Sequence, residues 1–510
     1  MPATVHEAAR ETPVVADVDV CVLGGGPAGI AAAASAARHG ARTLLVERYG
    51  FLGGMGTAAG VTNFCGLHGD VRGEKRRVVG GVASELLERI AALGGLNAPH
   101  LILGRVHAQA YDNAAYKCAA DALLAARGAS TLFHAAACGV TRAGDGCVDA
   151  LLVETRSGRA AVRARTFVDA SGDGELCHAA GLAMAKGDAA GGLLYPTLMF
   201  RVGAVDAARA GDAWRTIPER MDAAAADGSF AFPRRGAIVR PMPHADEWRV
   251  NVTQLKTPEG RAVDGTNAAE LSAAEAEGRR QAVDYLAFLR ARVPGFERAY
   301  LLELAPQLGI RETRRLIGEA TLSGDDVVGC SDADGALRDG ADDAAPVGVN
   351  DAARHGVNDA ARHGVNDAAR HGVNDAVGVN GWPLEMHVAG DVVWRWPPVG
   401  SRGYCQLPFR MLVPHRDGAA GAVNVLAAGR CASMTHEGHS AARVSGACFA
   451  MGQAAGTAAA LALAAHVEAR DIDIGALQRT LLADGAFLGG AFGEPPIGEV
   501  LPSSTTGSVA

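Results

Sequence analysis

Residues 17–29 read DVDVCVLGGGPAG, and this stretch decides the fold. Its first seven residues alternate and then become continuously apolar, as a central buried strand does. A helical pattern, PAGIAAAASAARHG, follows and ends at Gly40, and ARTLLVE at 41–47 is a second buried strand. We therefore expect a strand–helix–strand unit, which implies a parallel sheet with a right-handed crossover.

The three glycines at the first turn have the G-x-G-x-x-G spacing of a dinucleotide site. Gly24 permits the tight turn, Gly26 lets the backbone approach a pyrophosphate, and Gly29 lets the helix pack closely on the strand. The start of the helix then presents free N–H groups to the diphosphate. Glu47, at the end of the second strand, is placed to accept hydrogen bonds from a ribose.

Three further segments favour FAD over NAD. Residues 48–57, RYGFLGGMGT, form a glycine-rich loop whose amides can lie along a long flat ligand, where an NAD domain normally continues into a third strand. Residues 168–174, VDASGDG, end a strand in small residues, as flavin domains do. A long helix with Ser445 as its expected N-cap has a free positive end, which suits the N1 and C2 carbonyl edge of a flavin.

Composition narrows the class of protein. The 510 residues suffice for two or three domains, and 49% hydrophobic with 20% charged residues is a globular composition. The net charge of −8 with no basic block favours neither nucleic acid nor an anionic membrane. We see no secretory signal, and the Ala-rich stretch 454–466 looks too short to span a bilayer, so we expect a cytoplasmic protein.

The chain resembles the FAD-dependent oxidoreductases of the glutathione-reductase-like superfamily that include relatives of the heterodisulfide-reductase-A flavoproteins. The resemblance lies in GGGPAGIAAA (24–33), VERYGFLGGMGTA (46–58), VDASGDGELCHAAG (168–181), RETRRLIGE (311–319) and LAAGRCASMTHEGHSAARVSGACFAMGQAAGTAAA (426–460). It implies redox activity and FAD bound by these segments. The residues expected to bind FAD are Gly24, Gly26, Pro27, Ala28, Gly29, Glu47, Arg48, Gly53, Gly54, Met55, Ala170, Ser171, Gly172, Gly429 and Arg430.

Two absences narrow the redox chemistry. The closest cysteines, Cys138 and Cys147, are nine residues apart, so a 4Fe–4S cluster would be only a family-level label here, and we expect no metal site. There is no second glycine fingerprint of comparable quality, and Cys65 stands alone as an expected buried thiol. Electrons are therefore expected to pass between a small organic substrate and the flavin, and then to an unknown acceptor.

Four residues are candidates for catalysis. His436 and His439 in the polar loop THEGHS precede the helix that faces the flavin, so either is a candidate proton carrier or a simple hydrogen-bond partner. Arg443 is suited to a substrate carboxylate, to the flavin or to a structural salt bridge. His387 in the strand pattern WPLEMHV is either a core histidine or close to the active site.

Two other polar groups are expected near the site. A network that holds two domains together would consist of Arg311, Glu312 and Arg314. A positive, aromatic rim suited to an anionic substrate would consist of Arg402, Tyr404 and Arg410.

The predicted fold is α/β, a Rossmann-like FAD/NAD(P)-binding domain of the glutathione-reductase type with an inserted mixed α+β substrate domain. The octapeptide GVNDAARH repeats over 348–376, and we expect a disordered surface loop there, with a weak metal-binding tract of His355, His363 and His371 as the alternative. The predicted segments are the FAD domain in two parts (17–190 and 420–470), the substrate domain (191–345), the repeat loop (346–380), return strands (381–419) and a C-terminal tail (471–510).

The expected function is hydride transfer between a small organic substrate and non-covalently bound FAD. One alternative is an electron-transfer flavoprotein of the heterodisulfide-reductase-A type that passes electrons to a protein partner. Another is a FAD-dependent protein that modifies RNA or a cofactor, which the lack of basic patches disfavours. The sequence leaves the substrate and the oligomeric state open.

Overall fold

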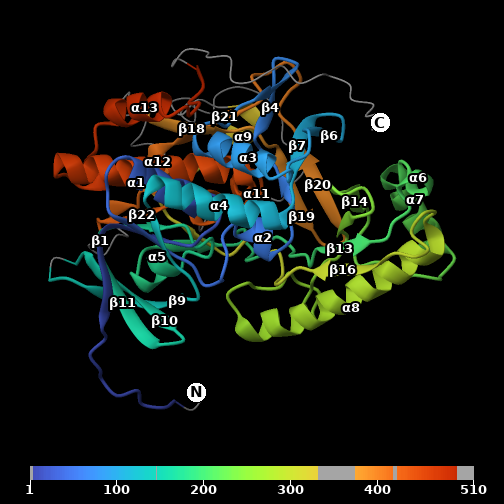
Figure 1. Ribbon diagram of the computed structural model, residues 1–510, viewed down its shortest axis with the longest axis horizontal. Helices are drawn as coiled ribbons and strands as arrows, with labels where there is room; N and C mark the ends of the chain where they lie inside the picture. Colours follow the sequence, from blue (N-terminus) through green and yellow to red (C-terminus); the bar gives the residue numbers. More distant parts are fainter. Residues whose placement is uncertain (1–3, 145, 331–373, 417–421, 491–510) are drawn as a thin grey trace.

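The main layer of the molecule is a mixed sheet in which most strands are parallel (Figure 1). The structure, a computed structural model, describes residues 4–144, 146–330, 374–416 and 422–490. Within these residues the sheet has seven strands in the order β8-β2-β1-β11-β10-β9, with β22 also paired to β11. The strands are β1 (Val14–Leu23), β2 (Thr43–Val46), β8 (Ser130–Leu132), β9 (Ala136–Arg142), β10 (Val148–Thr155), β11 (Gly158–Asp169) and β22 (Val425–Ala427).

Strand β11 joins the two ends of the chain in this sheet. Its first half pairs antiparallel with β10, and its last residues, Phe167 to Asp169, pair in parallel with β22. Strand β1 runs parallel to β11 along the other edge and also pairs in parallel with β2. The predicted α/β fold is therefore confirmed, and the segment around 425 completes the sheet that the N-terminal crossover begins.

Helices α1 (Pro27–Arg38) and α12 (Ser445–Ala465) pack against each other over the sheet (Figure 1). A Cβ added at Gly452 would lie 2.0 Å from the carbonyl oxygen of Ala28, and one at Gly456 would lie 2.1 Å from that of Ala32. These glycines, one turn apart on α12, therefore let the two backbones touch. Helices α3 (Val82–Ala92) and α4 (Asn113–Arg127) complete this layer.

By length and composition, helix α12 is long and apolar enough to cross a membrane. The stretch 454–466 looked too short in the sequence because the helix already begins at Ser445. In the structure 78% of its apolar window is buried, as in a core helix.

Two local predictions around α12 are wrong. Val444 is the N-cap, and Ser445 is the first helical residue, where its hydroxyl accepts from the Cys65 amide at 3.0 Å and donates to the Cys65 carbonyl at 3.1 Å. The expected polar loop is helix α11 (His436–Ala442), which begins because the Thr435 side chain accepts a hydrogen bond from the Gly438 amide. Polar residues here cap and form a helix instead of a loop.

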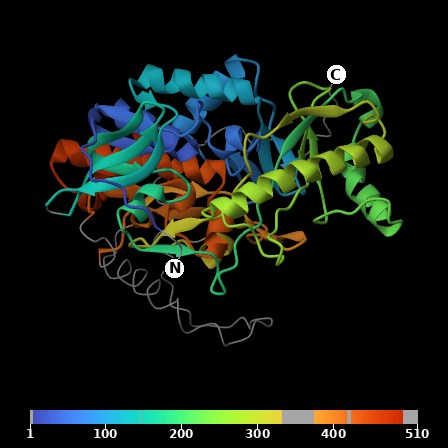
Figure 2. The ribbon, with the colours of Figure 1, turned by 90° about the horizontal axis from the view of Figure 1, so that it is seen from below.

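The inserted unit has its own sheet and core. Its antiparallel order is β14 (Ile238–Pro241), β15 (Trp248–Asn251), β13 (Phe200–Gly203) and β16 (Tyr300–Leu304). Trp248, Phe288 and Phe296 are buried between this sheet and its helices α6 (Ala207–Ala210), α7 (Ala213–Ala226) and α8 (Ala268–Arg292). Figure 2 shows α8 as a long helix alongside this sheet. The unit matches the expected mixed α+β character of this region.

Short elements connect the two sheets. The paired strands are β3 (Asn63–Phe64), β7 (Val106–Ala110) and β6 (His100–Ile102); β4 (His68–Val71) and β5 (Glu74–Arg77); β12 (Met184–Lys186) and β17 (Arg314–Leu316); β18 (Ala376–Asn380) and β21 (Cys405–Pro408); β19 (Leu384–Val388) and β20 (Asp391–Arg395). The remaining α-helices among the described residues are α2 (Met55–Ala58), α5 (Glu175–Ala179), α9 (Gly324–Gly329) and α13 (Ile474–Ala483).

Two predicted boundaries need correction. The repeat loop was expected to reach 380, but Ala376–Asn380 is the buried strand β18. The expected tail from 471 includes helix α13, which buries Leu477 and Leu481 because its apolar side chains recur at helical spacing. Residues 331–373, with the repeat and its three histidines, lie outside the described residues.

Candidate functional site

A large cavity lies where the carboxyl ends of the parallel strands meet the inserted unit. It has about 1750 Å³ of space between atoms, part of it open to solvent. The loops after β1, β2, β11 and β22 line one end, and the first residues of α12, the β13–β15 sheet and the β19–β20 hairpin line the rest. Ligands of open α/β sheets bind at these carboxyl ends.

The predicted cofactor residues gather at one end of this cavity, apart from Gly29 and Gly53. The lining ones are Gly24, Gly26, Pro27, Ala28, Glu47, Arg48, Gly54, Met55, Ala170, Ser171, Gly172, Gly429 and Arg430. Gly53 instead donates its amide to the Gly25 carbonyl at 2.8 Å, which joins the two glycine-rich loops. Segments far apart in the sequence therefore form one wall.

The three fingerprint glycines face different surroundings. Gly24 has φ +99°, and a Cβ there would lie 2.5 Å from the carbonyl oxygen of Ala170, while a Cβ at Gly29 would lie 1.7 Å from that of Gly24. At Gly26, φ is −75° and an added Cβ meets only the Cα of Gly54, at 3.7 Å. The protein itself requires glycine at 24 and 29, whereas the space at Gly26 is open toward the cavity, as the approach of a pyrophosphate needs.

Glu47 is held in a fixed orientation at the end of β2. Its Oε2 accepts from the Gly25 amide at 2.6 Å and its Oε1 from the Tyr49 amide at 2.9 Å. Burial raises the pKa of Glu47, although these two hydrogen bonds oppose the shift. The first hydrogen bond within α1 runs from Ile30 to Gly26, so the amides of Ala28 and Gly29 precede it. These features fit the ribose and diphosphate of FAD.

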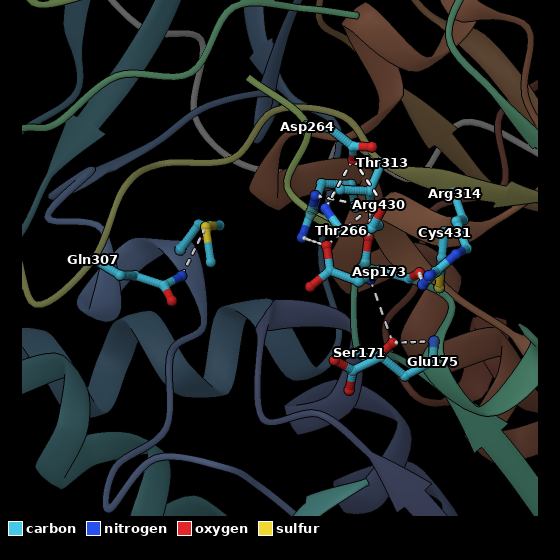
Figure 3. A network of polar contacts seen from close by, with 12 residues as sticks. Ser171, Asp173, Glu175, Asp264, Thr266, Gln307, Thr313, Arg314, Arg430 and Cys431 are labelled. Atoms are coloured by element: carbon cyan, nitrogen blue, oxygen red, sulfur yellow. Dashed lines mark hydrogen bonds and ion pairs between the residues drawn. The ribbon is translucent and has the colours of Figure 1, made fainter. Parts of the chain in front are cut away.

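A buried polar network fixes the wall beside this end (Figure 3). Asp173 accepts from Arg430 Nη2 at 2.8 Å and from the Thr313 hydroxyl at 2.9 Å. The Ser171 hydroxyl accepts from the amides of Asp173 at 3.3 Å and Glu175 at 3.1 Å. Burial would raise the pKa of Asp173, but the arginine charges and hydrogen bonds lower it. The network ties the end of β11 to the segments before β17 and after β22.

Of the four candidate catalytic residues, His387 and Arg443 line the cavity and the two histidines of α11 do not. His439 is fully buried, with its Nε2 3.0 Å from the Arg430 carbonyl oxygen, and His436 Nδ1 lies 2.9 Å from a Glu312 oxygen. The expectation that both lie close to the flavin ring does not fit this placement. The physical reason is that their segment is a helix whose buried face packs behind the cavity wall.

His387 belongs to a hydrogen-bonded series at the cavity. Its Nε2 lies 3.0 Å from Glu385 Oε1, and the Trp382 indole donates to Glu385 Oε2 at 2.9 Å. Burial would raise the pKa of Glu385, but the hydrogen bond from His387 and the Arg443 charge lower it to about 2. Burial, together with the charges of Arg311 and Arg443, lowers the pKa of His387 well below its usual range. The pair is therefore an ionised carboxylate and a neutral imidazole.

Arg311 also lines the cavity. Glu312 pairs with Arg315 and His436, and Arg314 donates to the Asp173 carbonyl at 3.4 Å. The contacts to His436 and Asp173 join the segments predicted as two domains, as expected for Glu312 and Arg314. Arg315, which lies in the RETRRLIGE motif but was not among the expected network residues, is a partner of Glu312.

The expected positive rim is not at this cavity. Arg402 lies over the Tyr404 ring at 5.0 Å, and Arg410 pairs with the buried Asp375 at 2.9 Å. Tyr404 packs on the Phe487 ring. These residues flank β21, which pairs with β18 in the core, so they stabilise that region and do not face the cavity.

One cysteine that the sequence singled out, Cys65, lies at the site. Cys65 lines the cavity, and burial raises the pKa of its thiol to about 12, so it is protonated at neutral pH. In the part of the chain that the structure describes, no group of three or more His, Cys, Asp or Glu side chains is placed to hold a metal ion.

Several lining residues were not predicted from the sequence. Glu385 lies two residues before His387 on β19, so the strand period of two places both on one face, a signal that could have been used. Asn63, Arg249 and Tyr111 also line the cavity, and nothing in their local sequence marks them.

One family model matches most of the chain. The model of the family "FAD dependent oxidoreductase" matches residues 19–481. No curated protein sequence matches the chain at a significant level. A solved geranylgeranyl bacteriochlorophyll reductase-like protein from Thermoplasma acidophilum is similar, with 14% identity and a TM-score of 0.41 over 92% of this chain and 84% of that one.

Two solved structures with other activities also match. A myxobacterial chondrochloren halogenase, described as FAD-dependent, has 15% identity and a TM-score of 0.38 over 59% of this chain and 65% of that one. The anhydrotetracycline hydroxylase of Streptomyces rimosus has 15% identity and a TM-score of 0.33 over 59% and 53%.

The family match covers more than half of the chain and includes every segment on which the FAD prediction rests. It does not single out the relatives of the heterodisulfide-reductase-A flavoproteins, so that part of the resemblance stays a prediction. The chain belongs to the FAD-dependent oxidoreductases, and FAD is its cofactor.

Proposed function

We propose that the protein transfers hydride between a small organic substrate and non-covalently bound FAD. The observation that carries this proposal is the single cavity, which has the glycine fingerprint at one end and side chains of the inserted unit at the other. A cofactor bound at the first end would leave the second end for a substrate. In this proposal, residues 17–190 and 420–470 form the FAD domain and the inserted unit supplies the specificity.

Each part of the wall has a proposed role. Gly26 and the first turn of α1 bind the diphosphate, Glu47 binds a ribose, and the start of α12 at Ser445 borders the flavin. The other predicted cofactor residues that line the cavity shape the rest of this site. FAD supplies the two-electron acceptor or donor.

His387 is the proposed carrier of the substrate proton. Hydride removal from an alcohol or amine requires a base for the heteroatom proton. A neutral imidazole that donates Nε2–H to Glu385 keeps a lone pair on Nδ1 for this purpose. In the free protein its lowered pKa keeps it neutral and makes it a weak base, and a bound anion that offsets the charges of Arg311 and Arg443 would raise that pKa toward the working pH. Arg443 and Arg311, beside it, would hold the substrate.

The test is anaerobic bleaching of the FAD-bound protein by a panel of small alcohols, amines and hydroxy acids, with no partner protein. We expect one class to reduce the flavin, and His387→Gln to slow that reduction by about 100-fold or more while FAD affinity stays unchanged. The matched control is His178→Gln, because His178 is exposed on α5 and outside the cavity.

Two results would overturn the proposal. If a reduced ferredoxin-like protein bleaches the flavin and no small molecule does, the electron-transfer alternative replaces it. If His387→Gln reacts with the substrate as fast as the control variant, His387 does not carry the proton.

A further inference from the structure

We propose that the end of the cavity beyond the cofactor residues binds the carboxylate of a small organic acid through Arg249, Arg311 and Arg443. This inference rests on the proposed function and names its substrate class. Arg249 comes from β15, Arg311 from the segment before β17, and Arg443 is the C-cap residue of α11, just before α12. All three line the cavity together with the Glu385–His387 pair.

The first argument is burial without a counter-ion. Arg249 is 6% exposed and Arg311 is 7% exposed. Arg311 donates only to the Tyr195 carbonyl, at 2.6 Å, and the Thr197 hydroxyl, at 2.8 Å, among the described residues. Arg249 donates its Nη1 to the Val61 carbonyl at 3.2 Å, and its buried Nε has no partner in the described structure. Among the described residues neither guanidinium forms an ion pair with a carboxylate, although the charge of Glu385 acts on Arg311 from a distance.

Arg443 gives the clearest case. Its Nε and Nη2 atoms are buried and have no hydrogen-bond partner among the described residues. Burial and the charge of Arg430 lower the pKa of Arg443, whereas Glu385 opposes that shift. Glu385 is already engaged by His387 and Trp382. A buried donor without an acceptor is costly, so a ligand anion is the natural partner for these atoms.

The neighbouring arginines of the same sheet have partners that Arg249 lacks among the described residues. The strand register places Arg240, Arg249 and Arg201 side by side on β14, β15 and β13. Arg201 pairs with Glu247 at 2.8 Å and Glu303 at 2.7 Å. Arg240 lies over the Trp214 ring at 3.8 Å and does not line the cavity. Arg249, the one of this row that lines the cavity, is the one without a carboxylate or aromatic partner in the described residues.

The shape of the occupant follows from the remaining wall. Apolar and aromatic side chains line the same cavity as the arginines, namely Ile102, Met199, Ile238, Trp382 and Trp394. The planar guanidinium fork matches a carboxylate through two parallel hydrogen bonds. An acid with an apolar or aromatic body, its carboxylate toward the arginines, fits both parts of the wall.

The test uses benzoate and its neutral isostere benzamide as probes of the FAD-bound protein, with the flavin absorbance as the signal. We expect benzoate to bind at least about tenfold more tightly than benzamide. Arg249→Gln, Arg311→Gln and Arg443→Gln should each weaken benzoate about tenfold or more. Arg240→Gln, which removes a neighbouring charge outside the cavity, should change benzoate affinity by about twofold or less.

Four results would overturn this inference. Equal affinity for benzoate and benzamide, which needs no variant, would show that charge is not recognised. If inorganic phosphate binds more tightly than benzoate, the arginines form a phosphate site and not a carboxylate site. If the three variants bind FAD more weakly but bind benzoate with unchanged affinity, the arginines bind the cofactor and not a substrate carboxylate. If Arg240→Gln weakens benzoate binding as much as the three cavity variants do, the effect comes from the overall positive potential and not from direct contact with the carboxylate.

The failure of this inference is distinguishable from failure of the proposed function. Benzoate binding needs no turnover, so it can succeed where no small molecule bleaches the flavin. Conversely, if only alcohols or amines without a carboxylate bleach the flavin, the oxidoreductase function is supported and the carboxylate site is overturned.

Discussion

At Gly26 an added methyl group would meet no protein atom closer than 3.7 Å, whereas at Gly24 and Gly29 it would collide with backbone oxygens. One sequence motif therefore contains positions of two kinds. Gly24 and Gly29 are required by the protein backbone itself. Gly26 is required only if a ligand approaches its Cα closely, which makes it the position where cofactor binding and folding can be separated.

This difference makes Gly26→Ala a test of the cofactor site. We expect the FAD-free variant to unfold at nearly the same denaturant concentration as the wild type, because the backbone at 26 suits any residue. FAD affinity should fall about tenfold or more, since the Cβ projects toward the diphosphate. Titration of FAD fluorescence measures the affinity.

Gly24→Ala is the contrasting variant. Its positive φ and the Ala170 carbonyl oppose a side chain, so we expect lower stability even without FAD. If Gly26→Ala keeps stoichiometric, tight FAD, the assignment of the diphosphate to this turn is wrong.

At the scale of elements, the contact between α1 and α12 sets the position of the cavity. The start of α1 and the start of α12 both line it, and their axes approach closely because Gly452 and Gly456 face Ala28 and Ala32. Side chains at these two glycines would separate the helices. The separation would then change the distance between the diphosphate end and the residues around Ser445.

Gly456→Ala should therefore affect both stability and the cofactor. We expect a loss of about 1–3 kcal/mol in the free energy of unfolding, because the added Cβ would lie 2.1 Å from the Ala32 carbonyl oxygen. FAD affinity should fall as well. Urea unfolding and flavin titration of the same preparation measure the two effects.

Gly475→Ala on α13 is the matched control. A Cβ there lies 3.2 Å from the ends of two flexible side chains and touches neither α1 nor α12. Replacing a helical glycine by alanine should leave stability unchanged or raise it by up to about 1 kcal/mol. A Gly456→Ala protein as stable as this control would mean that the two helices are not in tight contact.

At the scale of the whole molecule, packing has buried several histidines in a neutral state. Burial lowers the pKa of His68 to about 3, and it lowers the pKa values of His387 and His439 well below their usual range. In the unfolded chain these groups titrate near pH 6.5. Between that pH and their folded values, the unfolded chain binds more protons than the folded protein, so stability falls as the pH falls.

The FAD-free protein should consequently lose stability between pH 6.5 and pH 5. Each such histidine contributes about 1.4 kcal/mol per pH unit. Glu175 acts in the opposite direction, because burial raises its pKa to about 7 and protonation on acidification favours the folded state. His100 and His107 act in the same direction, because burial also lowers their pKa values, so the loss outweighs the gain from Glu175 and the free energy of unfolding falls as the pH falls.

Chemical unfolding at a series of pH values measures this slope. A free energy of unfolding that stays level or rises between pH 6.5 and pH 5 would show that these histidines are not buried in the neutral form.

The sequence by itself determined the local architecture of the cofactor end. The strand–helix–strand unit, the close packing at Gly29 and the position of Glu47 depend on residues close together in the chain. Periodicity and turn chemistry act over a few residues, so they can be read without knowing the rest of the fold.

Only the tertiary structure decided which polar side chains face the cavity. His387 lines it, while His436 and His439 turn into the core, although the sequence placed the THEGHS histidines near the flavin and left His387 as a core histidine or a residue close to the site. Arg249 lines the cavity because strand β15 of the inserted sheet reaches it. Which side chains line the cavity depends on how elements hundreds of residues apart pack together. A local sequence pattern contains no information about that packing.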